Sequence, residues 1–128
     1  MSFLKNIFGD SEPQNQISKM DWNQLTELGQ LDEIVEQSKA KPVLIFKHST
    51  RCIISRTVLK NFEKEFNLDG KIIPYYLDLL EYRPISNEIA SRFNVIHQSP
   101  QLLVIKDGMC IYNASHENIE VNKLVTIL

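Results

Sequence analysis

The most informative stretch of the chain reads Val43-Leu44-Ile45-Phe46-Lys47-His48-Ser49-Thr50-Arg51-Cys52-Ile53-Ile54-Ser55. Its apolar beginning predicts a central strand over residues 43–47, covered on both faces. From Cys52 onward the apolar residues take up a helical period, so a helix follows the strand. The stretch therefore places one cysteine at the end of a strand and the start of a helix. Ser55 stands where a second cysteine would complete a pair of thiols.

Helices and strands alternate along the rest of the chain. The apolar spacing, with proline and glycine at the boundaries, predicts a helix over residues 30–39, the strand 43–47, a helix from residue 52 to the Asp69-Gly70 turn, a strand over 72–77, a helix starting at Pro84, hairpin strands 102–105 and 109–112 joined by Asp107-Gly108, and a short C-terminal helix. This order indicates an α/β protein with a central mixed β-sheet flanked by helices. A βαβ unit is followed by a β-hairpin and a C-terminal helix.

The length of 128 residues fits one domain, which we expect to cover residues 21–128. Residues 1–20 are assigned to an N-terminal leader and linker, because residues 9–16 are polar and rich in turn formers. Residues 1–8 are apolar but lack the core and cleavage site of a secretory signal. They fit either a weak amphipathic helix or a frayed or packed leader.

The composition narrows the class of protein. A hydrophobic fraction of 43% and a charged fraction of 23% are those of a globular protein, and a net charge of −2 without a basic stripe argues against nucleic acid as a partner. No run approaches the roughly 20 apolar residues of a transmembrane helix. Two cysteines are too few for a secreted disulfide scaffold, so we expect a reducing compartment and a cytoplasmic location.

The surroundings of Cys52 suit a reactive thiol. Only the thiolate attacks a disulfide. The unpaired N–H groups at the helix start, the adjacent Arg51 and a charged His48 would all favour the thiolate. The Ser55 hydroxyl can donate a hydrogen bond to the sulfur but cannot form a disulfide. We assign Cys52 and Ser55 to catalysis, and Thr50, Arg51 and His48 to substrate binding. The alternative is a small buried hydrophobe at residue 52.

Two further segments belong to the candidate site. A proline at position 100, just before a strand, can be cis in this topology and lie against Cys52, which leaves the backbone of Ser99 free for an extended substrate. Residues 78–83 follow a parallel strand, so they should lie near Cys52. Arg83 and Arg51 would then clamp carboxylates of a low-molecular-weight thiol. The alternative for Arg83 is a surface salt bridge with Glu81 or Glu88.

Taken together, these motifs resemble a known family. The chain from about Trp22 to its C-terminus resembles the YtxJ-like proteins of the bacillithiol system, the monothiol bacilliredoxins. The motifs that carry the resemblance are Phe46-Lys47-His48-Ser49-Thr50-Arg51-Cys52 with Ser55, Arg83-Pro84-Ile85-Ser86-Asn87, His97-Gln98-Ser99-Pro100-Gln101, and Ser115-His116 with Ile119.

The resemblance implies a thioredoxin-like fold in which Cys52 is the single redox-active cysteine and Pro100 the cis-proline. Cys52 would take bacillithiol off protein mixed disulfides, become bacillithiolated itself, and be released by a second thiol. Bacillithiol would be a co-substrate, with no tightly bound cofactor, and bacillithiolated proteins would be the partners. Two residues depart from related patterns: Ile53 stands where family members often carry proline, and Phe46 where thioredoxins carry a buried acid.

Other interpretations stay open at this point. A thioredoxin-fold module that binds peptides or proteins without redox turnover is the main alternative to a thiol-disulfide oxidoreductase. An iron–sulfur carrier is disfavoured because Ile53-Ile54 replaces the glycine of such sites, and His48, His97 and His116 lack the local spacing of zinc ligands. Cys110 is expected to be a buried, inert cysteine within a strand, the alternative being a thiol that resolves Cys52.

Overall fold

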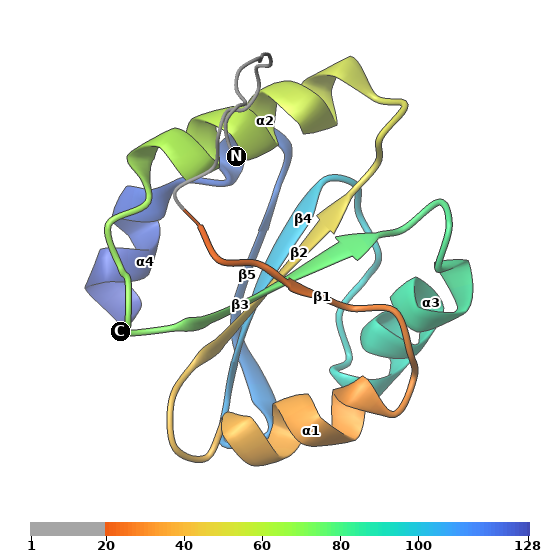
Figure 1. Cartoon of the computed structure of the whole chain (residues 1–128), viewed down its shortest axis with the longest axis vertical. Coiled ribbons are helices and arrows are strands. Elements are labelled where there is room, and N and C mark those ends of the chain that lie inside the picture. The colour runs from red at the N-terminus through yellow and green to blue at the C-terminus, as the bar shows by residue number, and fades with distance from the viewer. Residues whose placement is uncertain (1–19) are drawn as a thin grey trace, which may run out of the picture.

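A five-stranded mixed sheet forms the centre of the computed structural model, which describes residues 20–128 (Figure 1). The elements are β1 (Asn23–Gln24), α1 (Gln30–Gln37), β2 (Val43–His48), α2 (Ile53–Glu65), β3 (Ile73–Asp78), α3 (Arg83–Arg92), β4 (Gln101–Lys106), β5 (Met109–Ser115), the 3-10 helix η2 (His116–Asn118) and α4 (Val121–Ile127). The predicted helices and strands are confirmed. The short β1 and η2 are additional. The apolar segment 1–8 and nearly all of the expected leader lie outside the described residues.

The strands are arranged in the order β1-β3-β2-β4-β5. β2 pairs in parallel with β3 and antiparallel with β4, and β4 pairs antiparallel with β5. The segment β2-α2-β3 is thus the predicted βαβ unit, and β4-β5 is the predicted hairpin. β2 is the central strand, and all six of its residues are buried. Its position explains why residues 43–46 are continuously apolar rather than alternating.

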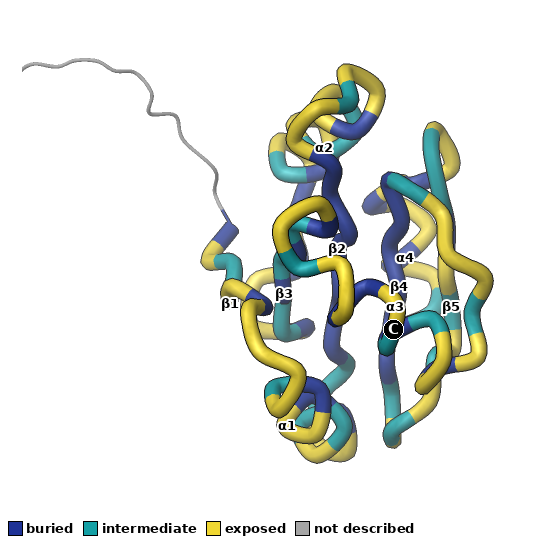
Figure 2. Tube along the Cα trace, turned by 90° about the vertical axis from the view of Figure 1, so that its right-hand side faces the viewer, coloured by how far each residue is buried: buried dark blue, intermediate teal, exposed yellow. Residues whose placement is uncertain are grey.

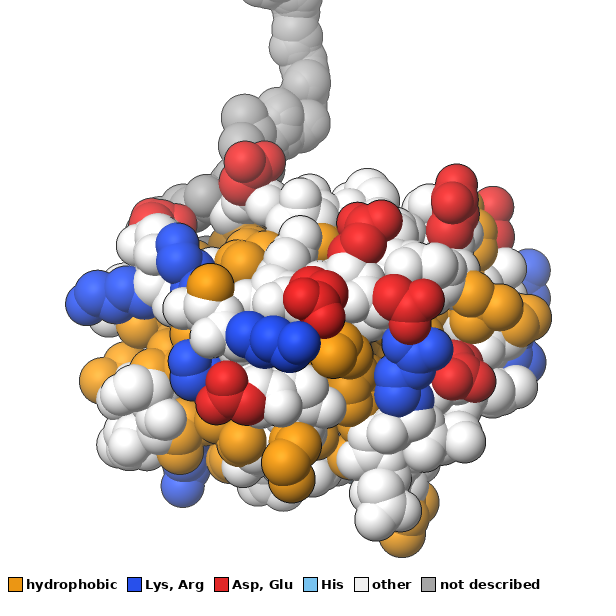
Figure 3. Space-filling model, turned by 90° about the horizontal axis from the view of Figure 1, so that it is seen from below, with side chains coloured by type: hydrophobic (Ala, Val, Ile, Leu, Met, Phe, Trp, Pro, Cys, Tyr) orange, Lys and Arg blue, Asp and Glu red, His pale blue; other side chains and the backbone are white. Residues whose placement is uncertain are grey.

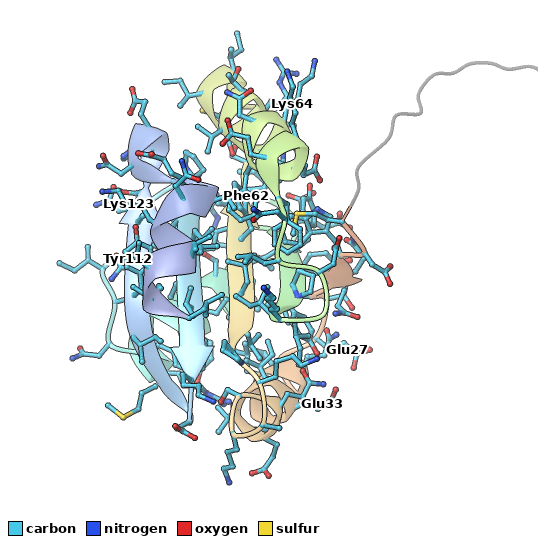
Figure 4. All side chains as sticks on the ribbon, turned by 90° about the vertical axis from the view of Figure 1, so that its left-hand side faces the viewer. Glu27, Glu33, Phe62, Lys64, Tyr112 and Lys123 are labelled. Atoms are coloured by element: carbon cyan, nitrogen blue, oxygen red, sulfur yellow. The ribbon has the colours of Figure 1, made fainter. Side chains whose placement is uncertain are left out.

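Each face of β2 contributes to a separate hydrophobic core. Leu44 and Phe46 pack with residues of α2 and α4, whereas Val43 and Ile45 pack with residues of α1 and α3. Figure 2 shows the buried residues following the strands, with exposed residues on the outer faces of the helices. Phe62 points from α2 toward the sheet, and Lys64 on the same helix points away from it (Figure 4). The rings of Phe62 and Phe46 lie 5.8 Å apart.

The hairpin turn explains the Asp107-Gly108 signal. Both residues have positive φ, 53° and 77°, as a two-residue turn matched to the twist of the strands requires. The turn is tied to the end of α1, because Gly108 donates its N–H to Oγ of Ser38 at 2.8 Å and Asp107 donates to the Ser38 carbonyl at 2.9 Å. Ser38 is fully buried, and these bonds give its hydroxyl and its carbonyl the hydrogen-bond partners that buried polar groups need.

Acidic and basic side chains are interspersed on the end of the molecule seen from below in Figure 3. This face therefore carries no field of a single sign, in keeping with the net charge of −2. Within residues 20–128, no helix has the length and apolar character needed to cross a bilayer.

Candidate active site at the start of α2

Cys52 is the N-cap residue of α2, directly after the turn that follows β2. Its backbone is extended (φ −104°, ψ 122°), its N–H donates to the Ser49 carbonyl at 3.2 Å, and its carbonyl accepts the N–H of Arg56 at 3.0 Å. Among residues 20–128, no side chain caps the helix. An N-cap side chain normally accepts a hydrogen bond from the second or third helical amide, here Ile54 or Ser55. The half-buried Cys52 is therefore the residue at the N-terminus of α2, where the unpaired amides and the positive end of the helix dipole lie.

Ser55 lies beneath this turn and is fully buried. Its Oγ accepts the N–H of Ser49 at 3.0 Å and lies 2.8 Å from Nδ1 of His48. The predicted hydrogen bond from Ser55 to the sulfur is therefore wrong, because among the described residues its hydroxyl has these two partners and no bond to Cys52. Ser55 instead fixes the turn that carries Cys52 by joining it to the end of β2.

His48 also differs from the expectation of a nearby positive charge. It is only 4% exposed, and its ring packs against Tyr76 at 5.7 Å. Burial, the largest effect, lowers the pKa of His48, Asp78 opposes that shift and Arg56 adds to it. A neutral ring is therefore favoured at pH 7. Its placement under the surface gives His48 a supporting role beneath Cys52 rather than direct contact with a substrate.

The surface around Cys52 combines charge with apolar area. Thr50 and Arg51 are exposed beside it, and Ile53 is 70% exposed on its other side. Ile54 is 51% exposed, so it does not belong to the inner face of α2 that its spacing suggested. It contributes instead to a groove of about 320 Å³ lined by Ile53, Ile54, Thr57, Val58, Asn61, Glu117 and Ile119. No sequence pattern indicated this groove, because η2 brings Glu117 and Ile119 to it from the far end of the chain.

The Ser99–Pro100 segment reaches the same end of the sheet. β4 starts at Gln101, which is the register partner of Lys47 in β2, so Pro100 lies beside the end of β2. The peptide bond between Ser99 and Pro100 is cis, as the family resemblance implies. Pro100 is buried and its carbonyl accepts the N–H of His116 at 3.2 Å, whereas Ser99 is half-buried.

Arg83 is the first residue of α3 and is exposed. The strand before it, β3, ends at Asp78, the register partner of His48, so residues 78–83 leave the sheet at the same edge as the turn before Cys52. Within the described residues, Arg83 forms neither of the ion pairs considered for it. Glu88 pairs with Arg92 at 3.3 Å instead. Arg83 is therefore a cation without an acidic partner in the described part of the chain.

Cys110 lies far from this site. It pairs with Ile105, which in turn pairs with Val43 at the opposite end of β2. At about 3.3 Å per strand residue, the length of β2 separates the levels of the two cysteines by roughly 15 Å, well beyond the 7 Å or so that a disulfide spans. Both cysteines are free. Cys110 was expected to be a buried, inert cysteine within a strand; it does lie in a strand, but it is half-buried rather than buried.

One buried polar residue of this region was not singled out from the sequence. Lys47, the last residue but one of β2, is completely enclosed. The available signal was a lysine inside the apolar run that forms the central strand, but the groups that enclose it come from distant parts of the sequence.

Comparison with known proteins gives a consistent picture. The family described as monothiol bacilliredoxin BrxC matches residues 23–124. A solved structure described as having a thioredoxin fold is 32% identical, with a TM-score of 0.70 over 80% of this chain and 89% of that one.

More distant structures share the fold. A thioredoxin from Malassezia sympodialis is 19% identical, with a TM-score of 0.66 over 91% of this chain and 95% of that one. Mitochondrial thioredoxin 3 from Saccharomyces cerevisiae is 17% identical, with a TM-score of 0.64 over 82% of this chain and 91% of that one. The chain therefore has a thioredoxin-like fold and belongs to the monothiol bacilliredoxin family of thiol-redox proteins.

Proposed function

We propose that the protein is a monothiol thiol-disulfide oxidoreductase that removes bacillithiol from protein mixed disulfides through Cys52. The observation that carries this proposal is the position of Cys52 as the N-cap residue of an α2 helix that no other side chain caps. Such a position leaves the thiol half-exposed to a substrate sulfur at the positive end of a helix. A single reactive thiol fits the distance of Cys110 and the serine at position 55.

The reaction consists of two exchanges. The Cys52 thiolate attacks the bacillithiol sulfur of the mixed disulfide, a new sulfur–sulfur bond forms between them, and the protein sulfur leaves as a thiolate that takes up a proton. A second thiol molecule, as its thiolate, then attacks the bacillithiol sulfur on Cys52. It forms a disulfide with that bacillithiol and releases the Cys52 thiolate. The second thiol is thus the reductant. Since both steps need thiols kept reduced, we place the activity in the cytoplasm.

Arg51 and Arg83 supply the positive charge for the low-molecular-weight thiol. Both are exposed, and Arg83 stands at the edge of the sheet where β2 and β3 end. In the Arg83→Ala variant we expect KM for a bacillithiolated protein to rise about fivefold to tenfold, as the loss of a charge-assisted hydrogen bond predicts. Lys64→Ala is the matched control, because Lys64 points away from the sheet at the other end of α2 (Figure 4). An equal KM in both variants would remove Arg83 from the site.

The choice of thiol is tested by steady-state turnover. A bacillithiolated protein, the same protein glutathionylated, and the same protein linked to coenzyme A are offered with matched concentrations of the free thiol as reductant. We expect turnover to be fastest with the bacillithiol adduct. Equal rates with all three would mean a general mixed-disulfide reductase. Binding of the target protein without turnover of any adduct would favour a binding module of thioredoxin fold.

A further inference from the structure

Lys47 is a cation enclosed in the protein interior, and no carboxylate of the described residues lies beside it. Its side chain is fully buried between β2, α3 and the segment that joins α3 to β4. Burial lowers the pKa of Lys47 to about 8, and no acidic group offsets the loss of hydration. An enclosed ammonium of this kind destabilises a fold relative to an apolar side chain of the same shape. Its presence in the central strand therefore calls for an explanation other than stability.

The ammonium of Lys47 ties two elements to β2. Its Nζ donates to the Ser86 carbonyl in α3 at 3.2 Å and lies 3.3 Å from Nδ1 of His97. Because an ammonium only donates, Nδ1 of His97 must be the acceptor, and the ring is then neutral with its proton on Nε2. The Oγ of Ser86 lies 3.4 Å from Nδ1 of His97. Lys47 therefore fixes both the position and the tautomer of a side chain on an exposed segment.

Gln101, the register partner of Lys47 on β4, holds the residues on either side of His97. Its Nε2 donates to the Ile96 carbonyl at 2.9 Å and its Oε1 accepts the N–H of Gln98 at 3.4 Å. Gln101 is 1% exposed, whereas Ile96 is 83% exposed. A surface segment is thus anchored by two enclosed polar side chains, Lys47 and Gln101, and it leads directly into Ser99 and Pro100.

We propose that Lys47 is a positioning residue for substrate recognition: through His97 it holds residues 96–99 in the arrangement that receives the substrate beside Cys52. This inference rests on the proposed function. It assigns Lys47 no contact with the substrate and no part in the attack of the Cys52 thiolate. The bond lasts only while Nδ1 of His97 lacks a proton, so substrate binding should weaken at acid pH.

The environment of His97 lowers its pKa throughout. Burial, Lys47 from β2 and Arg83 from α3 all lower the pKa of His97, in that order. Lowering the pH through that pKa puts a proton on the ring, removes the acceptor for Lys47 and places two cations within 3.3 Å of each other. The segment 96–99 then loses its link to Lys47, whereas the hydrogen bonds from Gln101 to Ile96 and Gln98 remain.

The test uses Lys47→Met, which keeps the length of the side chain, and His97→Gln, an acceptor without a proton to gain at acid pH. The first readout is KM and kcat with a bacillithiolated protein at pH 7.5 and pH 5.5. The second is the single-turnover reaction of Cys52 with a small symmetrical disulfide. Such a small substrate should make few contacts with segment 96–99.

We expect Lys47→Met to raise KM about tenfold at pH 7.5, as the loss of one charged hydrogen bond predicts, with kcat and the small-disulfide reaction within about twofold of wild type. In His97→Gln, KM should not rise between pH 7.5 and pH 5.5, whereas it should rise in the wild type. An unchanged KM in Lys47→Met, or an equal loss in the small-disulfide reaction, would overturn the proposal.

Two physical measurements separate this inference from the proposed function. NMR titration should show the pKa of His97 rising in Lys47→Met even if Cys52 proves unreactive, and an unchanged value would contradict the contact. The melting temperature of Lys47→Met should equal or exceed that of wild type below pH 8. The difference should shrink between about pH 8 and 10.5, where folded Lys47 has lost its proton and the unfolded chain has not. A large loss of stability would mark Lys47 as merely structural.

Discussion

The two cysteines of this chain show what position in a fold does to the same functional group. Cys52 and Cys110 are both half-buried and both free of disulfides. Cys52 is the N-cap residue of α2, and among the described residues its sulfur makes no hydrogen bond. Cys110 lies in the edge strand β5, its thiol donates to the Tyr112 carbonyl at 3.3 Å, and burial raises its pKa. Exposure does not separate the two thiols, but the groups around them do.

The comparison teaches that the thiol proposed to react is the one that lies beside backbone amides without a hydrogen-bond acceptor among the described residues. Around Cys52 the amides of the first helical turn have no side-chain cap among residues 20–128, and they form the positive end of the helix. Around Cys110 the sulfur has its own acceptor and the strand amides have the ladder. Cys52 thus lies at the positive end of a helix, whereas Cys110 lies in a strand where burial raises its pKa.

The largest expected effect is the loss of exchange in Cys52→Ser. Removing the only nucleophile should lower the rate of dethiolation by about a thousandfold or more, whereas Cys110→Ser should stay within about twofold of wild type. The measurement is the release of bacillithiol from a bacillithiolated protein under excess reductant. Comparable losses in the two variants would break the distinction between the cysteines.

Ser55→Cys should change the course of the reaction rather than its first step. The new thiol lies three residues after Cys52 on the first turn of α2, a spacing at which a dithiol can close. We expect the mixed disulfide on Cys52 to be replaced by an internal disulfide, with its lifetime shortened about tenfold to a hundredfold. Mass spectrometry under non-reducing conditions distinguishes the two products. Ser55→Ala, which also removes the bonds to His48 and Ser49, is the control for damage to the turn.

The pH dependence of alkylation should mark Cys110 as a protected thiol. In a Cys52→Ser background, only the thiolate of Cys110 reacts with iodoacetamide, and burial keeps its pKa above the ordinary value. Its rate should therefore rise about tenfold per pH unit from pH 7 to pH 8.5. A rate that is already level at pH 7 would show that Cys110 is ionised and would remove the contrast.

The smallest expected effects concern stability. Here the substitution of Cys110 should have the larger effect and that of Cys52 the smaller, the reverse of their order in activity. Cys110→Ala removes partly buried contacts and a hydrogen bond, so we expect the free energy of unfolding to fall by about 1 kcal/mol. Cys52→Ser should change it by less than about 0.5 kcal/mol, since serine is a good N-cap. Urea unfolding checks both values. A large loss in Cys52→Ser alone would make Cys52 a structural residue.

The fold was largely predictable because its strongest signals are local. The apolar run before Cys52 predicted the central strand, and Asp107-Gly108 predicted a turn whose residues both take positive φ. β1 was not predictable, since Asn23 and Gln24 are polar and form a strand only through pairing with β3. A strand of two residues is too short to show the alternating pattern by which strands are predicted.

The site was predictable only where one segment contains it. The strand-to-helix turn fixed the place of Cys52, and Pro100 was indicated by its position just before a strand and by the family resemblance. The contacts of His48 and Ser55 were assigned wrongly, because burial of both side chains pairs them with each other. Lys47 was missed because its enclosure depends on Ser86 and His97, which α3 and its following segment bring from 39 and 50 positions away. The spacing of residues along the sequence does not show which distant residues come into contact in the fold.

The most direct test of the central claim is intact-mass spectrometry of the reduced protein after brief exposure to bacillithiol disulfide, with Cys52→Ser and Cys110→Ser in parallel. We predict one bacillithiol adduct on the wild-type chain and on Cys110→Ser, and none on Cys52→Ser. An adduct that persists in Cys52→Ser and disappears in Cys110→Ser would contradict the assignment of Cys52 as the reactive thiol.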